Sequence, residues 1–369
     1  MNIHGAVLEE IGRVRPYQDS HPITISALEL DEPGPGEVLV RIEAAGICHS
    51  DLSVVNGSRV RPVPMLLGHE ASGRVEKLGT GVADLTVGQR VIMTFLPRCG
   101  ECAGCQTNGR LPCSVGSAAN NAGVLLNGGV RLHRDGHDIL HHLGVSGFAT
   151  HAVVDRHSIV PIEDDIPADI AAVLGCAVLT GGGAVMNAGH PEQGDSIAIV
   201  GLGGVGMAAL ITAVSLAKGT VIGIDAVPAK LAKATELGAS AVYSPQEALA
   251  AGITAAVVVE AAGNVRAFET AVAVTAPGGR TVTVGLPAPD ARASISPLGL
   301  VAQARSIVGS YLGSAVPSRD IPRYAQLWRD GSLPVDQLIS RRVGLSDINE
   351  AMDELSDGKA IRQVIIFDD

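Results

Sequence analysis

The segment from Ser196 to Gly206, Ser-Ile-Ala-Ile-Val-Gly-Leu-Gly-Gly-Val-Gly, decides the fold of this chain. Its first five residues are apolar enough for a buried strand, and the glycines at 201, 203 and 206 follow with the spacing G-x-G-x-x-G. The uncharged run that continues to Ala217 has the length of a helix. A strand, a glycine turn and a helix in this order predict a βαβ unit of a parallel sheet.

The second strand of this unit, Val221–Ile224, ends at Asp225, nineteen positions after Gly206. An acidic residue at that place completes the dinucleotide-binding fingerprint, in which the glycines admit the pyrophosphate to a helix N-terminus. Asp225 is expected to accept hydrogen bonds from the adenosine ribose and to repel a 2′-phosphate, which favours NAD over NADP. A strand-end aspartate that only caps a helix is the alternative. The loop residues predicted to bind the coenzyme are Gly201, Gly203, Gly204, Val205 and Gly206.

Alternating strands and helices continue to about residue 308. Helices are expected at Pro228–Leu237 and Arg266–Val274, between runs rich in β-branched residues. Six parallel strands would complete a doubly wound sheet of the α/β class. The four strands predicted beyond the first two are Ala241–Tyr243, Ala256–Glu260, Arg280–Val284 and Ser306–Val308.

The N-terminal part of the chain contains short strands separated by turn signals. The turn sequence PGPG at 33–36 leads into Glu37–Ile42, which alternates in period two, and a similar run begins at Gly73. These patterns predict a mostly antiparallel β domain. A length of 369 residues allows for this domain and a second one. The last strand, Gln363–Phe367, is expected to return to the β domain.

A first set of metal-binding residues is predicted between Gly46 and Glu70. Cys48 and His69 lie in this segment, and Cys176 stands far downstream in another glycine-rich stretch. Thiolate and imidazole are ligands that Zn²⁺ prefers, and a catalytic zinc has three protein ligands and one open position. We therefore expect a zinc ion where these segments meet.

A second set is formed by four cysteines within fifteen residues. Cys99, Cys102 and Cys105 are separated by two C-x-x-C steps, and Cys113 follows eight residues later. Four thiolates fill a tetrahedron and leave no position for a substrate, so the spacing predicts a structural zinc. An iron–sulfur cluster and four free thiols are the alternatives.

Composition excludes several classes of function. Against 27 basic residues stand 38 acidic ones, which gives a formal net charge of −11, and aromatic residues make up 2 %. Neither figure supports a nucleic-acid surface. Two uncharged runs, Ile170–Gly189 and Ser196–Ala217, are broken by glycines and are interpreted as buried elements, not membrane spans. The N-terminus has no basic region followed by an apolar region and therefore does not resemble a secretory signal peptide. We expect a cytoplasmic protein whose cysteines bind metal and do not form disulfides.

Residues 114–140 are polar, rich in glycine and asparagine, and predict a long surface loop. Four histidines fall in or near this loop. We expect them to be solvated or hydrogen-bonded and not to bind metal. They are His133, His137, His141 and His142.

Together these motifs resemble the zinc-dependent medium-chain alcohol dehydrogenases, over nearly the whole chain. The four-cysteine segment, Cys176 and the dinucleotide fingerprint follow in that family's order. The residues that match the family's signature are Gly68, His69, Glu70, Gly73, Gly79 and Val82.

The resemblance implies a GroES-like catalytic domain formed by residues 1–177 and 309–369, with a Rossmann domain of residues 178–308 between them. It implies a catalytic zinc held by Cys48, His69 and Cys176, and a structural zinc in the four-cysteine lobe. Members with a long polar loop after the cysteines are dimers, which implies a homodimer.

The resemblance also assigns roles around the zinc. Asp51 would brace His69, and Glu70 would lie close behind the metal. Ser50 matches the hydroxyl that takes the alcohol proton, and His49 matches a coenzyme-phosphate position. Further coenzyme positions implied are Thr180, Lys230, Val284 and Arg362. The expected walls of an apolar substrate pocket are Ser50, Phe95, Phe148 and Leu286.

Two positions depart from relatives. Ser53 stands where many members have a relay histidine, so the proton relay from Ser50 is expected to end at water. Arg59 stands where glutathione-dependent formaldehyde dehydrogenases have an acidic residue, which argues against that activity.

The function implied is reversible, NAD-linked oxidation of an aryl or medium-chain primary alcohol, or of a secondary alcohol, to the carbonyl compound. Zinc would act as the Lewis acid and nicotinamide would accept the hydride. The alternatives are a formaldehyde dehydrogenase of the glutathione type, a polyol dehydrogenase, and a non-enzymatic NAD-binding structural protein on the same fold.

Overall fold

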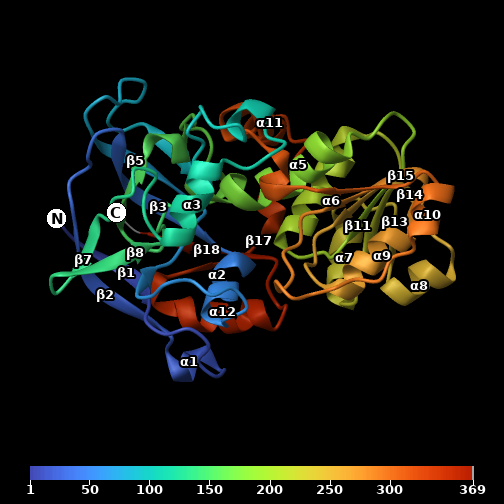
Figure 1. Cartoon of the computed structure of the whole chain (residues 1–369), viewed down its shortest axis with the longest axis horizontal. Helices are drawn as coiled ribbons and strands as arrows, with labels where there is room; N and C mark the ends of the chain where they lie inside the picture. Colours follow the sequence, from blue (N-terminus) through green and yellow to red (C-terminus); the bar gives the residue numbers. More distant parts are fainter. Residues whose placement is uncertain (368–369) are drawn as a thin grey trace. The chain divides into compact units, whose positions relative to one another are not determined.

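The computed structural model describes residues 1–367 and divides into two compact units. Unit 1 consists of Met1–Cys176 and the described part of Ile339–Asp369, and unit 2 consists of Ala177–Leu338. In Figure 1 the segments coloured from blue to green and the deep red segments make up unit 1, and the yellow-green to orange segments make up unit 2.

Unit 2 contains a six-stranded sheet with the order β13-β12-β11-β14-β15-β16. Every neighbouring pair is parallel, and β11 lies between β12 and β14. This order is that of a doubly wound dinucleotide-binding sheet, so the predicted fold class is confirmed. The strands are β11 (Ile197–Val200), β12 (Val221–Ile224), β13 (Ala241–Tyr243), β14 (Ala255–Glu260), β15 (Thr275–Thr283) and β16 (Ser306–Gly309).

Helices pack against this sheet, as Figure 1 shows for α6, α7 and α9. The first of them begins directly after the glycine turn and is buried over most of its length, because it carries no charged residue. The helices are α5 (Leu179–Gly183), α6 (Gly204–Leu216), α7 (Pro228–Glu236), α8 (Pro245–Ala250), α9 (Val265–Ala273), α10 (Pro297–Ala302) and α11 (Pro317–Arg329). The other helical segments are the π-helix η4 (Ala184–Gly189) and the 3₁₀ turns η5 (Tyr311–Ser314) and η6 (Val335–Leu338).

Unit 1 is a β structure made of a small closed barrel and a seven-stranded sheet. The barrel, in the order β1-β2-β7-β8-β4, consists of β1 (Asn2–Leu8), β2 (Ile23–Leu30), β7 (Leu132–Arg134), β8 (His137–His141) and β4 (Met65–Leu66). The sheet consists of β3 (Glu37–Ile47), β5 (Ala71–Leu78), β6 (Arg90–Met93), β9 (His151–Asp155), β10 (Ile159–Pro161), β17 (Ile339–Val343) and β18 (Arg362–Ile366).

The long strand β3 is the centre of that sheet. It pairs antiparallel with β5, β9 and β18, so strands from both ends of the chain meet on it. The expected return of the last strand to the β domain is therefore confirmed. One contiguous core of buried apolar side chains lies beneath these strands.

The helices of unit 1 are short. They are α1 (Tyr17–Ser20), α2 (His49–Val55), α3 (Ser114–Ala122), α4 (Ala168–Val173) and α12 (Ile348–Ser356), with single turns η1 (Cys105–Thr107), η2 (Arg156–Ser158), η3 (Leu174–Val178) and η7 (Leu345–Asp347). Ile348, Met352 and Leu355 of α12 are buried in the core, as the spacing of these residues predicts.

The boundary expected at residue 309 lies at residue 339 in the structure. Residues 309–338 belong to unit 2 because their contacts are made there. The amide of Asn187 donates to the carbonyl of Gly313 at 3.3 Å and to Asp320 at 3.1 Å. The ring of Tyr324 is buried directly against Gly182, where a Cβ would lie 2.7 Å from it.

The long loop expected at residues 114–140 is wrong in part, because α3 and the β7–β8 hairpin lie within it. Asp135 and Gly136 turn the hairpin, both with positive φ, as a two-residue hairpin loop requires. The Asp-Gly pair is a hairpin signal that the polar composition of the segment obscures.

Among the described residues, one helical run, Ala168–Gly189, is long and apolar enough by composition to cross a membrane. Of its most apolar window, 83 % is buried inside the protein, which is the pattern of a core helix.

Candidate active site and metal centres

Cys48 is fixed at the junction of β3 and α2. Its backbone N–H donates to Asp51 Oδ2 at 3.0 Å, which closes the first turn of α2 around the residue. The side chain of Cys48 is buried, while His49 on the next position is exposed and Ser50 is half-buried.

His69 and Cys176 come to the same place from other elements. His69 follows the short strand β4, and Cys176 lies in the π-helical turn η3. The Nε2 atom of His69 lies 3.5 Å from Sγ of Cys176, and the ligand atoms of Cys48, His69 and Cys176 all lie within 4.8 Å of one another. All three side chains are buried.

These distances fit a tetrahedral zinc ion. With Zn–S near 2.3 Å and Zn–N near 2.0–2.1 Å, a sulfur and a nitrogen on one tetrahedron are about 3.6 Å apart. In the described part of the chain, no fourth histidine, cysteine or carboxylate joins this group. Three protein ligands are the number found at catalytic zinc sites.

The charges around these ligands also call for a cation. A hydrogen bond between the side chains of Cys48 and Cys176 holds the pKa of the Cys48 thiol well below its usual range. The same bond, together with burial, raises the pKa of the Cys176 thiol. Glu70 is fully buried, neither of its oxygens has a hydrogen-bond partner, and burial raises its pKa to about 7. Arg362 brings one buried positive charge to 3.4 Å from Glu70, and a metal ion bound by the two thiols would supply further positive charge that offsets the cost of burying this cluster.

Asp51 connects this group to a second histidine. Its Oδ1 lies 3.0 Å from Nδ1 of His69 and 3.1 Å from Nδ1 of His142. Burial opposes ionisation of Asp51, but the two histidines outweigh that effect and lower its pKa to about 2. The carboxylate therefore stays charged and fixes His69 with Nε2 towards the metal ligands.

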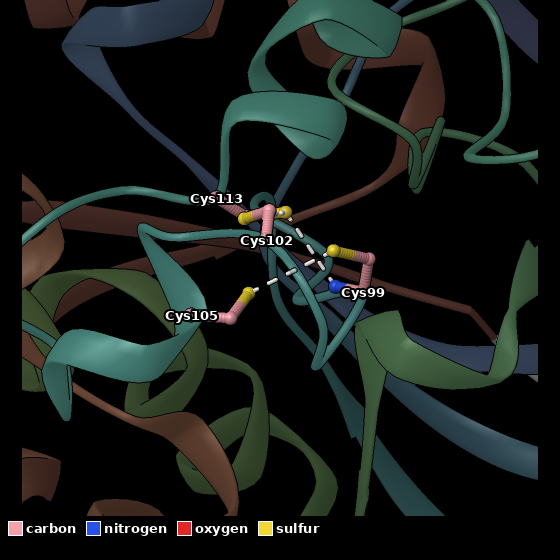
Figure 2. A group of neighbouring side chains, drawn as sticks. All are labelled: Cys99, Cys102, Cys105 and Cys113. Atoms are coloured by element: carbon pink, nitrogen blue, oxygen red, sulfur yellow. Dashed lines mark hydrogen bonds between the residues drawn. The ribbon is translucent and has the colours of Figure 1, made fainter.

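The four-cysteine segment forms a separate cluster in unit 1. Figure 2 shows the four sulfurs turned towards a common centre. Sγ of Cys99 lies 3.9 Å from that of Cys105, and Sγ of Cys102 lies 3.8 Å from that of Cys113. Sulfurs on a zinc tetrahedron are about 3.8 Å apart, so the cluster fits a closed, four-thiolate site. Cys113 also caps α3, since its sulfur accepts the N–H of Gly116 at 3.3 Å.

The glycine turn of unit 2 fits a dinucleotide. A Cβ on Gly206 would overlap the carbonyl oxygen of Gly201, so only glycine allows α6 to begin this close to β11. A Cβ on Gly203 would meet no protein atom within 4 Å, which leaves that face of the turn open to a phosphate at the helix N-terminus.

Asp225 follows β12 beside this turn. Its Oδ2 accepts the N–H of Leu202 at 2.7 Å and its Oδ1 accepts the N–H of Val227 at 2.9 Å. The half-buried carboxylate is thus held against the glycine turn. Lys230 on α7 and Val284 after β15 are half-buried, and Thr180 on α5 is buried.

Two family models match the chain. Residues 34–164 match the alcohol dehydrogenase GroES-like domain, and residues 204–329 match the zinc-binding dehydrogenase domain. The chain is 34 % identical over 376 residues to the putative alcohol dehydrogenase D of Mycobacterium tuberculosis. The alignment covers 99 % of this chain and 100 % of that protein. The chain belongs to the zinc-dependent medium-chain alcohol dehydrogenase family.

Other members are similar over their full length. Geraniol dehydrogenase of Castellaniella defragrans is 36 % identical over 377 residues, covering 100 % of this chain and 98 % of that protein. The crystal structure of benzyl alcohol dehydrogenase from Acinetobacter calcoaceticus has a TM-score of 0.91 at 29 % identity, with 100 % of both chains covered. The match supports zinc and a nicotinamide coenzyme and does not favour the formaldehyde, polyol or non-enzymatic alternatives.

In this member of the family, two of the expected site residues are buried within unit 1. Phe148 is not a wall of an open pocket, because its ring is fully buried in the core of unit 1. Arg362 is 2 % exposed, lies 3.4 Å from Glu70 and donates to the carbonyl of Ile47 at 3.1 Å, so the structure places it beneath the zinc ligands. Phe95 packs edge-on against the ring of His69, and Leu286 is half exposed after β15.

Sequence reasoning missed the position of His142. It was expected in a solvated or hydrogen-bonded role, yet its side chain is buried beside Asp51. The adjacent pair His141-His142, which precedes a predicted strand, was a sequence feature that could have drawn attention to this position. The local pattern does not indicate which of the two histidines faces Asp51.

Proposed function

We propose that this protein is an NAD-dependent alcohol dehydrogenase that acts on apolar primary alcohols. The observation that carries the proposal is the buried set of Cys48, His69 and Cys176, whose spacing fits one zinc ion with three protein ligands. The same chain carries a dinucleotide turn with an acidic residue at the end of the next strand.

Cys48, His69 and Cys176 would hold the catalytic zinc, and the four cysteines of the lobe would hold a second, structural zinc. Bound at the first site, zinc supplies a Lewis acid that favours loss of the proton from an alcohol oxygen. Asp51 orients His69, and the buried ion pair of Glu70 with Arg362 sets the charge behind the ligands.

Ser50 is the residue proposed to take the substrate proton. It lies two positions after Cys48 in the first turn of α2 and is half-buried. The hydroxyl of Ser53 donates to the carbonyl of Ser50 at 2.7 Å, so Ser53 is bound to its own helix. That local bond supports a relay that passes from Ser50 to solvent and not through Ser53.

The proposed preference for NAD rests on Asp225. Two backbone N–H groups hold its carboxylate beside the glycine turn, and a 2′-phosphate there would meet a like charge. Asp225→Asn keeps the shape and removes the charge. We expect it to narrow the ratio of NAD to NADP use by about 10-fold or more, since 1.4 kcal/mol corresponds to that factor.

Aryl and medium-chain primary alcohols are the proposed substrates. Geraniol and benzyl alcohol, which name two similar proteins, are both primary alcohols with a large apolar body. The edge of the Phe95 ring against His69 supplies an apolar surface beside the metal ligands.

The proposed assembly is a homodimer. In the described part of the chain, β16 pairs only with β15, so one edge of β16 is open. The neighbouring helix α10 exposes Leu298 and Val301 at 76 % and 80 %. An apolar patch beside an open strand edge suits a two-fold contact. None of the six cysteines forms a disulfide, which supports a reducing, cytoplasmic compartment.

The test is NADH formation at a fixed NAD⁺ concentration, with short, medium-chain, benzylic and polyol alcohols. Metal analysis of the same sample should give two zinc ions per chain. Benzylic or medium-chain alcohols should give the highest kcat/KM, and Cys48→Ala should abolish turnover while NAD⁺ binding, followed by fluorescence, stays within about 2-fold.

Normal turnover by Cys48→Ala would contradict the zinc assignment. No NADH from any alcohol, in protein shown to carry two zinc ions, would contradict the proposed substrate class. Higher kcat/KM with polyols than with benzylic alcohols would favour a polyol dehydrogenase instead.

A further inference from the structure

The ring of His69 contacts two other rings in addition to its hydrogen bond with Asp51. Its ring is packed edge-on by Phe95, with centroids 5.6 Å apart, and by His142, with centroids 5.5 Å apart and an interplanar angle of 84°. Phe95 follows β6 and His142 follows β8, so elements of both β layers of unit 1 meet on this one imidazole.

The contact of His142 with His69 is also electrostatic. Nδ1 of His142 lies 3.1 Å from the same Asp51 oxygen that faces His69, although the contact is not an aligned hydrogen bond. The N–H of Gly68 approaches that oxygen at 3.3 Å, and the second oxygen accepts the N–H of Cys48. Asp51 therefore has His69 and His142 on one oxygen, and both histidines are buried.

The backbone fixes His142 where it can do this. Its N–H lies 3.2 Å from the carbonyl of Leu66, in the strand that leads into His69, and 3.1 Å from the hydroxyl of Ser146. Leu143 and Ser146 have positive φ, so the chain turns sharply after His142. A residue placed this firmly, with a buried ring nitrogen and no aligned hydrogen bond, is expected to serve the carboxylate beside it.

We propose that His142 is a positioning residue for the zinc ligand His69, acting through the shared oxygen of Asp51 and through ring contact. It limits the rotation of both the carboxylate and the His69 ring, so that Nε2 of His69 stays directed at the site it shares with Cys48 and Cys176. The inference rests on the proposed zinc site and names a residue of its outer layer. Mutation of a residue that orients a metal ligand commonly lowers metal affinity 10–100-fold. Because His142 acts on His69 through Asp51, we expect an effect at the lower end of this range.

The test compares His142→Phe with His142→Gln and with His141→Phe as a matched control. Phenylalanine keeps a ring edge against His69 and removes the nitrogen, whereas glutamine keeps a polar donor near Asp51. His141 is the adjacent buried histidine, and its Nε2 accepts the N–H of Arg131 instead of touching Asp51. The same ring exchange at 141 removes the contacts of His141 with Arg131 and with the hydroxyl of Ser146, 3.4 Å away, and leaves the side chain of His142 in place as the ring nitrogen beside Asp51.

Two readouts do not depend on activity. One is the dissociation constant for Zn²⁺ by competition with a chelator, and the other is the visible absorption spectrum of Co²⁺-substituted protein. Cys176→Ser distinguishes the two metal sites. The zinc binding and the Co²⁺ absorption that disappear in this variant belong to the site of Cys48, His69 and Cys176 and not to the four-cysteine lobe. We expect His142→Phe to weaken Zn²⁺ binding about 10-fold and shift the Co²⁺ bands, with His142→Gln between it and wild type and His141→Phe like wild type.

Wild-type affinity and spectrum in His142→Phe would overturn the inference, as would equal changes in His141→Phe and His142→Phe. Alcohol oxidation measured on the same proteins separates the two proposals. A metal effect at His142 without any alcohol oxidation contradicts only the proposed function, and oxidation without a metal effect contradicts only the role of His142.

Discussion

At the scale of the residue, Gly203 and Gly206 have different reasons to be glycine. A Cβ at 206 would overlap the carbonyl of Gly201, whereas a Cβ at 203 would point into open space. Gly206 is required by the packing of α6 on β11, whereas Gly203 is required only if a ligand approaches the turn.

Gly203→Ala and Gly206→Ala should therefore separate folding from coenzyme binding. We expect Gly203→Ala to keep the wild-type Tm and to raise the Kd for NAD⁺ about 10-fold or more, which is about 1.4 kcal/mol. Gly206→Ala should lower stability by about 1–3 kcal/mol as well. Thermal unfolding and fluorescence titration with NAD⁺ measure both effects. Unchanged NAD⁺ binding in Gly203→Ala would contradict the phosphate position.

His141 shows how burial of a single side chain makes stability depend on pH. Burial lowers its pKa to about 4, well below the ordinary value near 6.5. The unfolded chain then binds the proton more readily, so stability is unaffected above about pH 6.5 and falls as the pH drops towards 4. At pH 5 the loss amounts to about 2 kcal/mol.

His141→Gln should remove this acid-dependent part. We expect its free energy of unfolding to fall less between pH 7.5 and pH 5 than that of wild type, by about 2 kcal/mol, in urea titrations. His137→Gln, at the exposed end of the same strand β8, is the control and should keep the wild-type slope. Equal slopes in wild type and His141→Gln would show that His141 does not cause the dependence.

At the scale of the element, the four-cysteine lobe is held by sulfur more than by apolar packing. Cys99, Cys102 and Cys105 are only partly buried, and η1 contains no buried residue. A metal ion bound by the four thiolates would supply the folding energy of such a segment. The N-terminus of α3 depends on the same site, because Cys113 is its cap.

Cys105→Ser should reduce zinc from two ions to one per chain and increase hydrogen exchange at the first amides of α3. The remaining zinc, at Cys48, His69 and Cys176, should be retained. Thr107→Ala lies in the same turn and removes the hydrogen bonds of Thr107 with Gly104 and Leu111 but no metal ligand, so it should keep both ions. Two ions per chain in Cys105→Ser would argue against a four-thiolate site.

At the scale of the whole molecule, the proposed homodimer would form at the open edge of the parallel sheet. The apolar side chains of α10 next to β16 are the most exposed of unit 2. Leu298→Lys combined with Val301→Lys should convert the proposed homodimer to a monomer in analytical ultracentrifugation, because two charges would be buried on each side of a two-fold contact.

Leu249→Lys is the matched control for this pair, since Leu249 is a half-exposed leucine on α8 of the same unit. It should leave the sedimentation coefficient unchanged. A dimer that survives both lysines on α10 would place the contact elsewhere, and a wild-type monomer would contradict the assembly itself.

Local pattern was sufficient for much of the fold. The apolar run before Gly201 and the alternation of strands and helices after it predicted the parallel sheet, and all six of its strands overlap their expected positions, although β15 begins five residues earlier than expected. The hairpin at 132–141 was missed because polar composition outweighed the Asp-Gly turn signal, and helix α3 was missed because its residues are small and polar. Strand and helix patterns are short-range, so they can be recognised without knowledge of the partner.

By itself, then, the sequence determined the fold class and the dinucleotide turn, and it predicted the two groups of cysteine and histidine side chains that the structure brings together. Only the tertiary structure decided that residues 309–338 pack with unit 2, that Arg362 pairs with Glu70, that Phe148 lies in the core, and that His142 shares Asp51 with His69. These contacts join residues far apart along the chain, and their partners are set by how sheets and turns pack in three dimensions.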